Sequence, residues 1–346
     1  MAAKFRVLSR SAAAVLSAGQ KPWGGPARDG EDEKMTVLEG LLAGIVSDPQ
    51  EETRWLVLAD WLEEFDDPRR AELLRLHRRL LSTCCEPKQH PQRSVWQTRI
   101  VALIAEGVRP CVPQETLVLP GGAEMTFSFI PPGTFLMGSD HKRANADEKP
   151  VHRVTLTKGF FLGIHPVTQT QWKAVTGSNP SHFPGDNRPV EQVSWDDCQE
   201  FCKTLTAHLE GRGTVGLPSE AEWEYACRAG TTTKYCTGDG AAALKKAGWY
   251  EGNSESQTHP VGELAANAWG LHDMHGNVWE WCQDGYGAYE GSDQIDPQIQ
   301  TNENKRIQRG GGGCYPPGHC RAACRGGFEP SGRDGYFGCR VCFRLD

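Results

Sequence analysis

The segment RGGGGCYPPGHCRAACRGG, residues 309–327, places the tightest limit on how this chain can fold. Glycine loses the most conformational freedom on folding, and proline lacks the N–H that a helix interior or a central strand requires. The segment must therefore form a loop, and this loop contains Cys314, Cys320 and Cys324. Three explanations are open: a redox or metal-binding active site, a zinc knuckle, or a purely structural loop.

The overall composition agrees with a loop-rich fold. The 346 residues include 39 glycines, 22 prolines and 11 tryptophans, and 38% of residues are hydrophobic. This favours loops anchored by aromatic side chains over long helices. The formal net charge of -7 argues against general nucleic-acid binding, which needs a basic face. No apolar run approaches the roughly 18 residues of a membrane span. Neither nucleic acid nor a membrane is therefore an expected partner.

Residues 1–34 are expected to be a disordered extension. They carry basic and small apolar residues, but Arg10 interrupts the apolar region that a signal peptide would need. Ordered patterning begins at Met35, which is a candidate for the true start of the protein. The 13 cysteines are an odd number, which does not suit a complete disulfide framework. The expected location is therefore cytoplasmic, with mostly reduced thiols.

Residues 35–82 have apolar side chains at helical spacing, interrupted by SDPQEET and DDPRR, and are expected to form a small helical domain. The stretch from MTVLEGLL to LLRLHRRL resembles a short helical domain that recurs at the N-termini of planctomycete proteins, with LADWLEE as its core. That domain has no established chemistry, so the resemblance implies none here.

Residues 83–116 are expected to be a linker with a helix near residues 96–106. From residue 117 to 346, short β-like runs such as MTFSFI alternate with turn residues, which predicts one irregular α+β domain. Two helices in it have a start signal, in which an acidic residue follows a serine by three positions: Ser194 with Asp197, and Ser219 with Glu222.

Landmarks spread over residues 123–346 resemble the formylglycine-generating enzyme family, also called sulfatase-modifying factors. In chain order they are IPPGTFLMGS, DEKPVHRVTL, HPVTQTQW, RPVEQVSWDDCQEFC, LPSEAEWEYACRAG, THPVGELAANAWGLHDMHGNVWEW, and the C-terminal group RGGGGC, CRAACR and GCRV. One landmark alone would be weak, but the ordered series is specific. The resemblance implies an irregular, loop-rich fold with little regular secondary structure around a lectin-like core.

The same resemblance implies an activity. Active members of the family oxidise a cysteine of a sulfatase to formylglycine with molecular oxygen. Two active-site thiols bind Cu(I), a soft ion that suits thiolate ligands. The implied partner is thus a protein or peptide that bears a sulfatase-type cysteine. Two alternatives stay open: a catalytically inactive member that acts as a binding or scaffold module, and a non-haem iron redox enzyme of the same superfamily.

The family's active pattern resembles G-G-S-x-x-C-x4-C, and two cysteines of this chain lie near its thiol positions. Counted from Gly310, Cys320 falls at the second thiol, whereas Cys314 falls one residue early and Gly312 replaces the serine. The loop that follows is also shorter than in active enzymes. If the chain is active, the resemblance implies that Cys314 and Cys320 bind copper and that Trp279 lines the site.

The resemblance further implies calcium. A first Ca²⁺ site would take four ligands from HDMHGNVWEW, namely the Asp273 carboxylate, the Gly276 and Val278 carbonyls and the Glu280 carboxylate. Ca²⁺ prefers several oxygen ligands, and a tight Gly-Asn turn can present carbonyls inward. A second, weaker site would use Asn253 and the Glu255 carbonyl. Without a metal, Asn277 and the neighbouring tryptophans would form a packed corner of the core.

The remaining cysteine and histidine patterns have simpler interpretations. Cys198 and Cys202 share one face of a predicted helix with apolar neighbours and are expected to pack in the core. The pairs Cys320/Cys324 and Cys339/Cys342 have zinc-like spacing, but GCRVCFRL as a terminal strand would point its two cysteines to opposite sides. Iron would need two histidines and a carboxylate, and His272 and His275 beside Asp273 are the available candidates.

Overall fold

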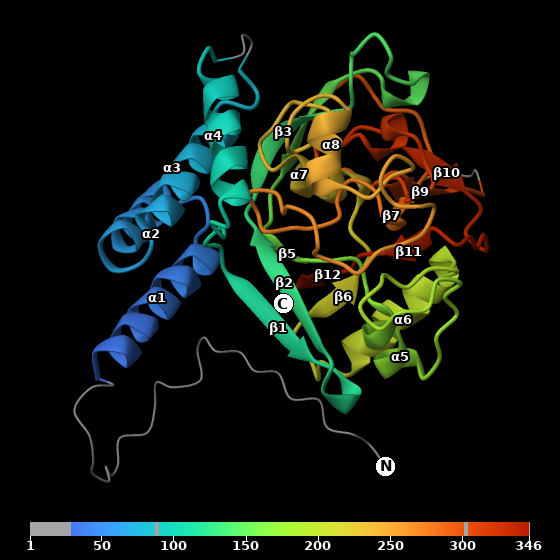
Figure 1. Cartoon of the computed structure of the whole chain (residues 1–346), viewed down its shortest axis with the longest axis horizontal. Helices are drawn as coiled ribbons and strands as arrows, with labels where there is room; N and C mark the ends of the chain where they lie inside the picture. The colour runs from blue at the N-terminus through green and yellow to red at the C-terminus, as the bar shows by residue number, and fades with distance from the viewer. Residues whose placement is uncertain (1–28, 87–89, 301–303, 346) are drawn as a thin grey trace.

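The computed structural model describes residues 29–86, 90–300 and 304–345 (Figure 1). Most of the predicted extension 1–34 therefore lies outside the described residues, and the first helix begins within it. The N-terminal helices are α1 (Asp29–Ser47), α2 (Glu52–Phe65), α3 (Pro68–Ser82) and α4 (Arg93–Ala105). The helical region is thus longer at both ends than residues 35–82, and the predicted linker 83–116 contains α4.

The turns between these helices follow from the sequence signals that interrupt them. The Asp67 carboxylate accepts the Arg69 N–H at 3.0 Å, and Pro68 occupies the first position of α3, where a missing N–H costs no hydrogen bond. Glu51 caps α2 in the same way by accepting the Thr53 N–H at 3.0 Å.

The rest of the described chain contains three sheets joined by long irregular loops. The strands are β1 (Gln114–Val118), β2 (Glu124–Ile130), β3 (Gly133–Met137), β4 (His152–Leu156), β5 (Phe160–Gly163), β6 (Thr214–Gly216), β7 (Trp279–Gly285), β8 (Gln294–Ile295), β9 (Arg306–Arg309), β10 (Gly326–Phe328), β11 (Phe337–Cys339) and β12 (Cys342–Arg344). Their orders are β1-β2-β5-β12-β6, β10-β9-β7-β11 and β3-β4-β8. Neighbours are antiparallel, except that β11 runs parallel to β7 and β8 runs parallel to β4.

Short helices lie between these strands, and the two predicted helix starts are confirmed. The helices are α5 (Gln169–Thr176), α6 (Trp195–Ala207), α7 (Glu220–Arg228) and α8 (Ala241–Ala247), with 3-10 turns η1 (Pro120–Gly122), η2 (Ala146–Glu148) and η3 (Pro317–Cys320). Ser194 and Ser219 each form a reciprocal capping box with the acidic residue three positions on. The mixed α+β architecture is as predicted.

The helical region packs along one side of the sheets and shares their core (Figure 1). One cluster of buried side chains joins Trp55 and Leu58 to residues of β2 and β5. A second cluster joins Leu80 and Trp96 to residues of β3 and α7. The buried Arg93 guanidinium of α4 also donates to the Gly230 carbonyl. The two regions are therefore joined by apolar packing as well as by the chain.

The C-terminal segment GCRVCFRL differs from the single strand that its sequence predicts. It forms two short strands in different sheets, with β11 beside β7 and β12 between β5 and β6. The physical reason is Arg340 between them, whose fully buried guanidinium pairs with Glu280 and so bends the chain from one sheet to the other.

Two further findings concern the whole described chain. Within residues 29–86, 90–300 and 304–345, no helix combines the length and apolar character needed to cross a bilayer. All of the cysteines in the sequence lie in this part, and each is a free thiol.

Candidate functional site

The cysteine loop, residues 310–320, is held between two arginines that have buried partners. Arg309 precedes the loop at the end of β9, and its buried guanidinium pairs with Glu224 of α7. Arg321 follows the loop and donates to both oxygens of the buried Glu148 at 2.6 Å. Removing Arg321 would leave the Glu148 charge buried without an ion-pair partner, which is strongly unfavourable, and removing Arg309 would take one of two cations from Glu224. Both ends of the loop are therefore fixed in place.

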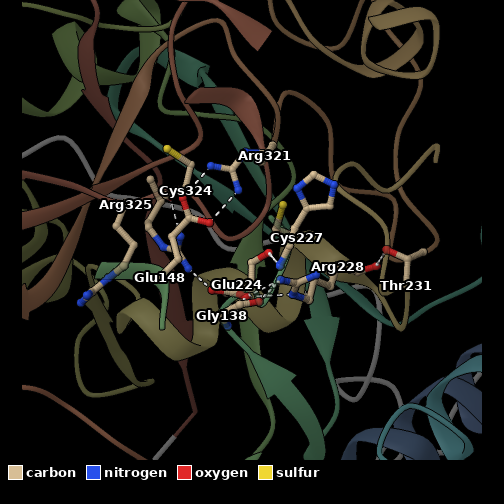
Figure 2. Close-up of polar contacts among 12 residues, drawn as sticks. Gly138, Glu148, Glu224, Cys227, Arg228, Thr231, Arg321, Cys324 and Arg325 are labelled. Atoms are coloured by element: carbon tan, nitrogen blue, oxygen red, sulfur yellow. Dashed lines mark hydrogen bonds and ion pairs between the residues drawn. The ribbon is translucent and has the colours of Figure 1, made fainter. Parts of the chain in front are cut away.

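Glu224 is the centre of this buried charge network. Its Oε1 accepts the Gly138 N–H at 3.0 Å and the Arg228 Nε–H at 2.8 Å, and its Oε2 accepts from Arg309. Figure 2 shows the carboxylate between Gly138 and Arg228. Burial disfavours the ionised carboxylate, but the two guanidinium groups outweigh burial and hold the pKa of Glu224 below its usual value.

Glycines form the tight turn at the start of the cysteine loop. Gly310 and Gly311 have φ values of 96° and 75°, which side-chain-bearing residues rarely adopt. A Cβ on Gly311 would lie 2.8 Å from the Cys320 sulfur. The Gly310 carbonyl accepts the Gly276 N–H at 2.7 Å, so the turn is packed directly on the segment predicted to bind calcium.

Cys320 is sealed inside the protein. Its side chain is 0% exposed and packs with Tyr235, Leu244 and Tyr250. Burial raises the pKa of the Cys320 thiol, because a thiolate is poorly solvated there. The neutral thiol is therefore the stable form in the folded chain.

His275 fixes the backbone of Cys320. Its Nε2 accepts the Cys236 N–H at 3.0 Å, which assigns the proton to Nδ1, and Nδ1–H donates to the Cys320 carbonyl at 2.9 Å. Burial lowers the pKa of His275 to about 4, so the ring is neutral near pH 7. Both ring nitrogens of His275 thus have structural partners, and the ring serves to position the loop.

Cys314 has a different environment. Its side chain is half-buried, and its thiol contacts the Tyr336 hydroxyl. Burial raises the pKa of Cys314, and the Tyr336 contact opposes that shift. The Tyr336 hydroxyl donates to the Ser256 carbonyl, which fixes the ring beside the thiol. Cys314 is therefore the accessible thiol of the cysteine loop.

A copper ion shared by Cys314 and Cys320 would require two thiolates at one point. The Gly311 turn and the ring of Tyr235 enclose Cys320, whereas Cys314 faces Tyr336. The described residues contain no disulfide between the two cysteines and no group of three metal-binding side chains, although Cys314 lies close enough to help raise the pKa of the Cys320 thiol. In this conformation the residues fit one accessible thiol rather than a ready two-thiol copper site. Joint copper binding stays a prediction.

Trp279 begins β7 and packs against Tyr315 of the cysteine loop, and its role in lining a site stays a prediction. It is almost fully buried, and its ring packs edge-on against three others. The ring centroids are 5.6 Å apart for Tyr315 and 6.2 Å apart for both His319 and Phe328. Its indole Nε1 has no hydrogen-bond partner within the described residues. This nitrogen is shielded from solvent and lies next to the Tyr315 side chain, so a ligand would reach it only if Tyr315 moved.

Half-buried or exposed rings continue from Trp279 around Cys314. The ring centroid of Tyr315 lies 5.6 Å from that of His319 and 6.2 Å from that of Tyr336. The ring centroid of Tyr336 lies 5.5 Å from that of Phe183. We call Phe183, Tyr315, His319, Phe328 and Tyr336 the aromatic rim. The rim comes from three separate segments of the chain and surrounds the accessible thiol with apolar, stackable surface.

The residues of the first predicted calcium site do come together, but one is already neutralised. Both Glu280 oxygens accept from the Arg340 guanidinium at 2.8–3.1 Å, and Oε2 also accepts the Trp223 indole N–H at 2.6 Å. The buried Asp273 carboxylate accepts the Gly262 N–H at 2.8 Å through Oδ2, while Oδ1 has only a 3.4 Å contact with Asn277.

This geometry fits a calcium ion in part. Asp273 retains an oxygen for a cation, and Gly276 and Val278 lie on the same segment, whereas Glu280 already balances Arg340. Burial raises the pKa of Asp273, and a cation beside it would reverse that effect. Calcium here stays a prediction, with Glu280 as its weakest ligand.

The second predicted calcium site has fewer free oxygen ligands for a cation. The Asn253 Oδ1 accepts the Tyr250 N–H at 2.8 Å, and its Nδ2 donates to the Gly248 carbonyl at 3.1 Å. The Asn253 amide therefore closes its own loop. Glu255 has a φ of 55°, in the left-handed region, within the turn that follows. A calcium ion here also stays a prediction.

The other cysteines lie where core packing was expected. Cys198 and Cys202 are buried in α6, and Cys339 packs in the same cluster as they do. Cys342 belongs to a different cluster and contacts the Gly216 carbonyl at 3.1 Å. The four cysteines with zinc-like spacing are thus divided between separate parts of the core.

Sequence reasoning missed the buried charge network and the aromatic rim. A signal for the network exists in CRAACR, whose arginines are four residues apart, and in α7, where Glu220 and Glu224 lie one turn apart on one face. Two like charges on one buried helix face require cations opposite them. No comparable signal exists for the rim: four of its rings lie within residues 315–336 but in largely irregular chain without a repeating pattern, and Phe183 comes from a distant segment.

The irregular α+β fold of residues 119–345 is that of a sulfatase-modifying-factor type domain. Residues 119–345 match the family described as the sulfatase-modifying factor enzyme 1-like domain. The chain belongs to this family, and the helical region precedes the matched domain.

Curated relatives carry several names. The chain is 32% identical over 238 residues to a protein named chaperone protein LppX of Paenibacillus barcinonensis, covering 54% of this chain and 81% of that one. It is 31% identical to the formylglycine-generating enzyme of Streptomyces coelicolor, over 52% of this chain and 60% of the enzyme. It is 34% identical to the serine/threonine-protein kinase pkn1 of Chlamydia caviae, over 53% of this chain but only 32% of the kinase.

Solved structures support the same fold. The Treponema denticola variable protein 1 is 28% identical with a TM-score of 0.63, over 68% of this chain and 100% of that protein. PvdO from Pseudomonas aeruginosa is 27% identical with a TM-score of 0.58, over 65% of this chain and 95% of PvdO. Family members with different names thus share this domain, so the family alone does not fix the activity.

Proposed function

We propose that this chain binds a polypeptide segment that bears a cysteine, and that the aromatic rim around Cys314 is the binding surface. The observation that carries the proposal is the arrangement of that surface. One accessible thiol lies on a loop fixed by buried ion pairs and is surrounded by rings that peptide side chains can pack against.

The names of two relatives support a polypeptide ligand. One is named a chaperone, and another is named for generating formylglycine, which the resemblance in the sequence associates with a sulfatase cysteine. Polypeptide recognition is the element that both names share. The accessible thiol beside the rim supports a cysteine as the recognised side chain.

Oxidation of the bound cysteine to formylglycine is the second candidate function. It is favoured by the presence of two thiols, Cys314 and Cys320, on one short fixed loop. Copper, when bound by thiolates, would supply the activation of oxygen. The residues of this chain would contribute peptide binding at the rim and a fixed position for the loop through His275. Because Cys320 is sealed, this activity requires the loop to open.

Binding is tested by fluorescence anisotropy with a labelled peptide that carries a sulfatase-type cysteine motif. We expect Tyr315→Ala to weaken binding by about tenfold, the effect of losing one central aromatic anchor. Trp61→Ala, which removes a half-buried ring from the helical region, is the matched control and should leave the affinity unchanged. Equal affinity of Tyr315→Ala and the parent chain would exclude the rim as the binding surface.

Oxidation is tested separately with Cu(I)-loaded protein, oxygen and a soluble thiol. The thiol is needed because converting a cysteine and O2 into an aldehyde, hydrogen sulfide and water consumes two additional electrons and two protons. A product mass corresponding to formylglycine, lost in both Cys314→Ser and Cys320→Ser, would identify an oxidase. Peptide binding without this product would leave the binding module as the function.

A further inference from the structure

A second pair of thiols lies outside the family domain, at the end of α3. Cys84 and Cys85 are adjacent in sequence, half-buried, and their sulfurs are 3.5 Å apart. Together with Cys314 they are the described cysteines that are not buried. The pair lies where the helical region meets the sheets, since the Cys84 thiol contacts the Thr134 carbonyl of β3 at 2.7 Å.

The surroundings of this pair are positively charged. The buried Arg93 guanidinium donates to the Leu80 carbonyl at 2.7 Å, to the Thr83 hydroxyl next to Cys84, and to the Gly230 carbonyl. These acceptors are all neutral, and in the described residues Glu86 acts on Arg93 from a distance without forming an ion pair with it. A buried cation without a counter-ion is unfavourable. A thiolate at the cysteine pair would supply the missing negative charge.

A second arginine approaches from the sheet side. Arg153 of β4 donates to the Cys85 carbonyl at 3.4 Å, and its only ion-pair partner in the described chain is the exposed Asp293 at 4.0 Å. Two guanidinium groups from different parts of the fold thus lie near the Cys85 thiol.

The geometry distinguishes between a disulfide and a metal site. Consecutive Cα atoms across a trans peptide are about 3.8 Å apart, whereas an unstrained disulfide needs about 4.4 Å or more between its Cα atoms. A disulfide between neighbours would therefore be strained. Two thiolates at about 2.3 Å from a tetrahedral ion lie about 3.8 Å apart. The observed separation of 3.5 Å is close to that value, whereas a linear ion with only two thiolates would need about 4.6 Å, so the pair suits an ion that also takes a further ligand.

We propose that Cys84 and Cys85 form a two-thiolate site for a soft, thiophilic metal ion such as Cu(I). Thiolates select soft ions, and the half-buried position leaves the other side of the ion open to an external ligand. The site is independent of the cysteine loop and does not rest on the function proposed for it.

The test is a Cu(I) titration of the full, reduced chain under anaerobic conditions, in competition with a chromogenic Cu(I) chelator. We expect Cys84→Ser/Cys85→Ser to weaken Cu(I) retention by about tenfold or more. The matched control, Cys314→Ser/Cys320→Ser, should keep the tight equivalent that belongs to the adjacent pair. Equal retention by the parent chain and Cys84→Ser/Cys85→Ser would overturn the proposal.

A second measurement needs no variant. Alkylation of the parent chain, read by peptide mass spectrometry, should label Cys84 and Cys85 in the metal-free protein and be slowed at both positions by one equivalent of Cu(I). Unchanged labelling of both residues in the presence of Cu(I) would equally contradict the site.

Discussion

The position of the cysteine loop depends on single buried charges. Arg309 lies between Glu220 and Glu224, and none of these side chains is more than marginally exposed. We expect Arg309→Ala to lower the free energy of unfolding by about 1.5–3 kcal/mol, because the buried Glu224 would lose one charge-assisted hydrogen bond and keep only Arg228 as its cation, while Glu220 keeps Arg325. Arg333→Ala, which removes the exposed partner of Asp197, is the control and should cost under about 1 kcal/mol.

Urea denaturation of the two variants measures this difference. Similar losses for Arg309→Ala and Arg333→Ala would mean that the buried network does not hold the loop.

His275 makes stability depend on pH in a defined direction. Its pKa is about 4 in the folded chain and about 6.5 when exposed, so the unfolded chain takes up the proton first as the pH falls. The neutral ring makes its full contribution to the free energy of unfolding above pH 6.5, and this contribution is lost progressively as the pH falls toward 4. We expect the parent chain to lose about 3 kcal/mol relative to His275→Gln across this window.

Urea unfolding of both chains at several pH values tests this expectation. The comparison separates the effect of His275 from that of Asp284. Burial raises the pKa of Asp284 to about 7, so its contribution to stability falls, rather than rises, as the pH increases. Parallel stability curves for the two chains would contradict the role assigned to His275.

At the residue scale, the sequence indicated which side chains lie near one another, but it did not indicate the partners or the exposure of each side chain. Asp273 and Glu280 were predicted to share a calcium ion, which stays a prediction, and Glu280 pairs with Arg340, which lies far along the chain. Cys320 was assigned to the active site from its register, whereas its exposure depends on Tyr235 and Leu244 from another segment. Local patterns carry neither kind of information.

At the scale of elements, the local start signals were reliable. The Ser219 hydroxyl accepts the Glu222 N–H at 3.2 Å, and the Glu222 carboxylate accepts the Ser219 N–H at 2.7 Å. We expect Ser219→Ala to lower the free energy of unfolding by about 1 kcal/mol, because one N–H of α7 loses its partner. Thermal or urea unfolding measures the change.

Ser178→Ala, an exposed serine outside the helices, is the control for this substitution and should have an effect near zero. If the two alanine variants unfold alike, the capping box contributes nothing to α7.

Capping boxes were predictable because all their atoms lie within four consecutive residues. The C-terminal strands were not, because the change of sheet between β11 and β12 depends on the buried pairing of Arg340 with Glu280. Alternating apolar residues alone predict one strand there. The aromatic rim is a similar case, since Phe183, Tyr315 and Tyr336 become neighbours only through the fold.

At the scale of the whole molecule, the helical region and the family domain share two apolar clusters. They should therefore unfold in one cooperative transition. We expect Leu80→Ala to destabilise the whole chain by about 2–5 kcal/mol, since this buried side chain packs in a cluster that reaches α7. Val95→Ala, at a side chain that is 64% exposed, is the control.

Differential scanning calorimetry of the two variants distinguishes the cases. A separate low-temperature transition in Leu80→Ala, with an unchanged second transition, would show that the helical region folds independently of the sheets.

The central claim is that the rim around Cys314 receives a cysteine-bearing polypeptide. Disulfide trapping tests it most directly, with a peptide whose cysteine is activated as a mixed disulfide with a small aromatic thiol. Mass spectrometry then locates the attachment among the accessible thiols, and the activated form of free cysteine serves as the reference reagent. We predict that the peptide, unlike the reference, reacts at Cys314 at least about tenfold faster than at Cys84 or Cys85, and that Tyr315→Ala removes this preference. The same ratio of labelling with the peptide and with free cysteine would contradict the claim.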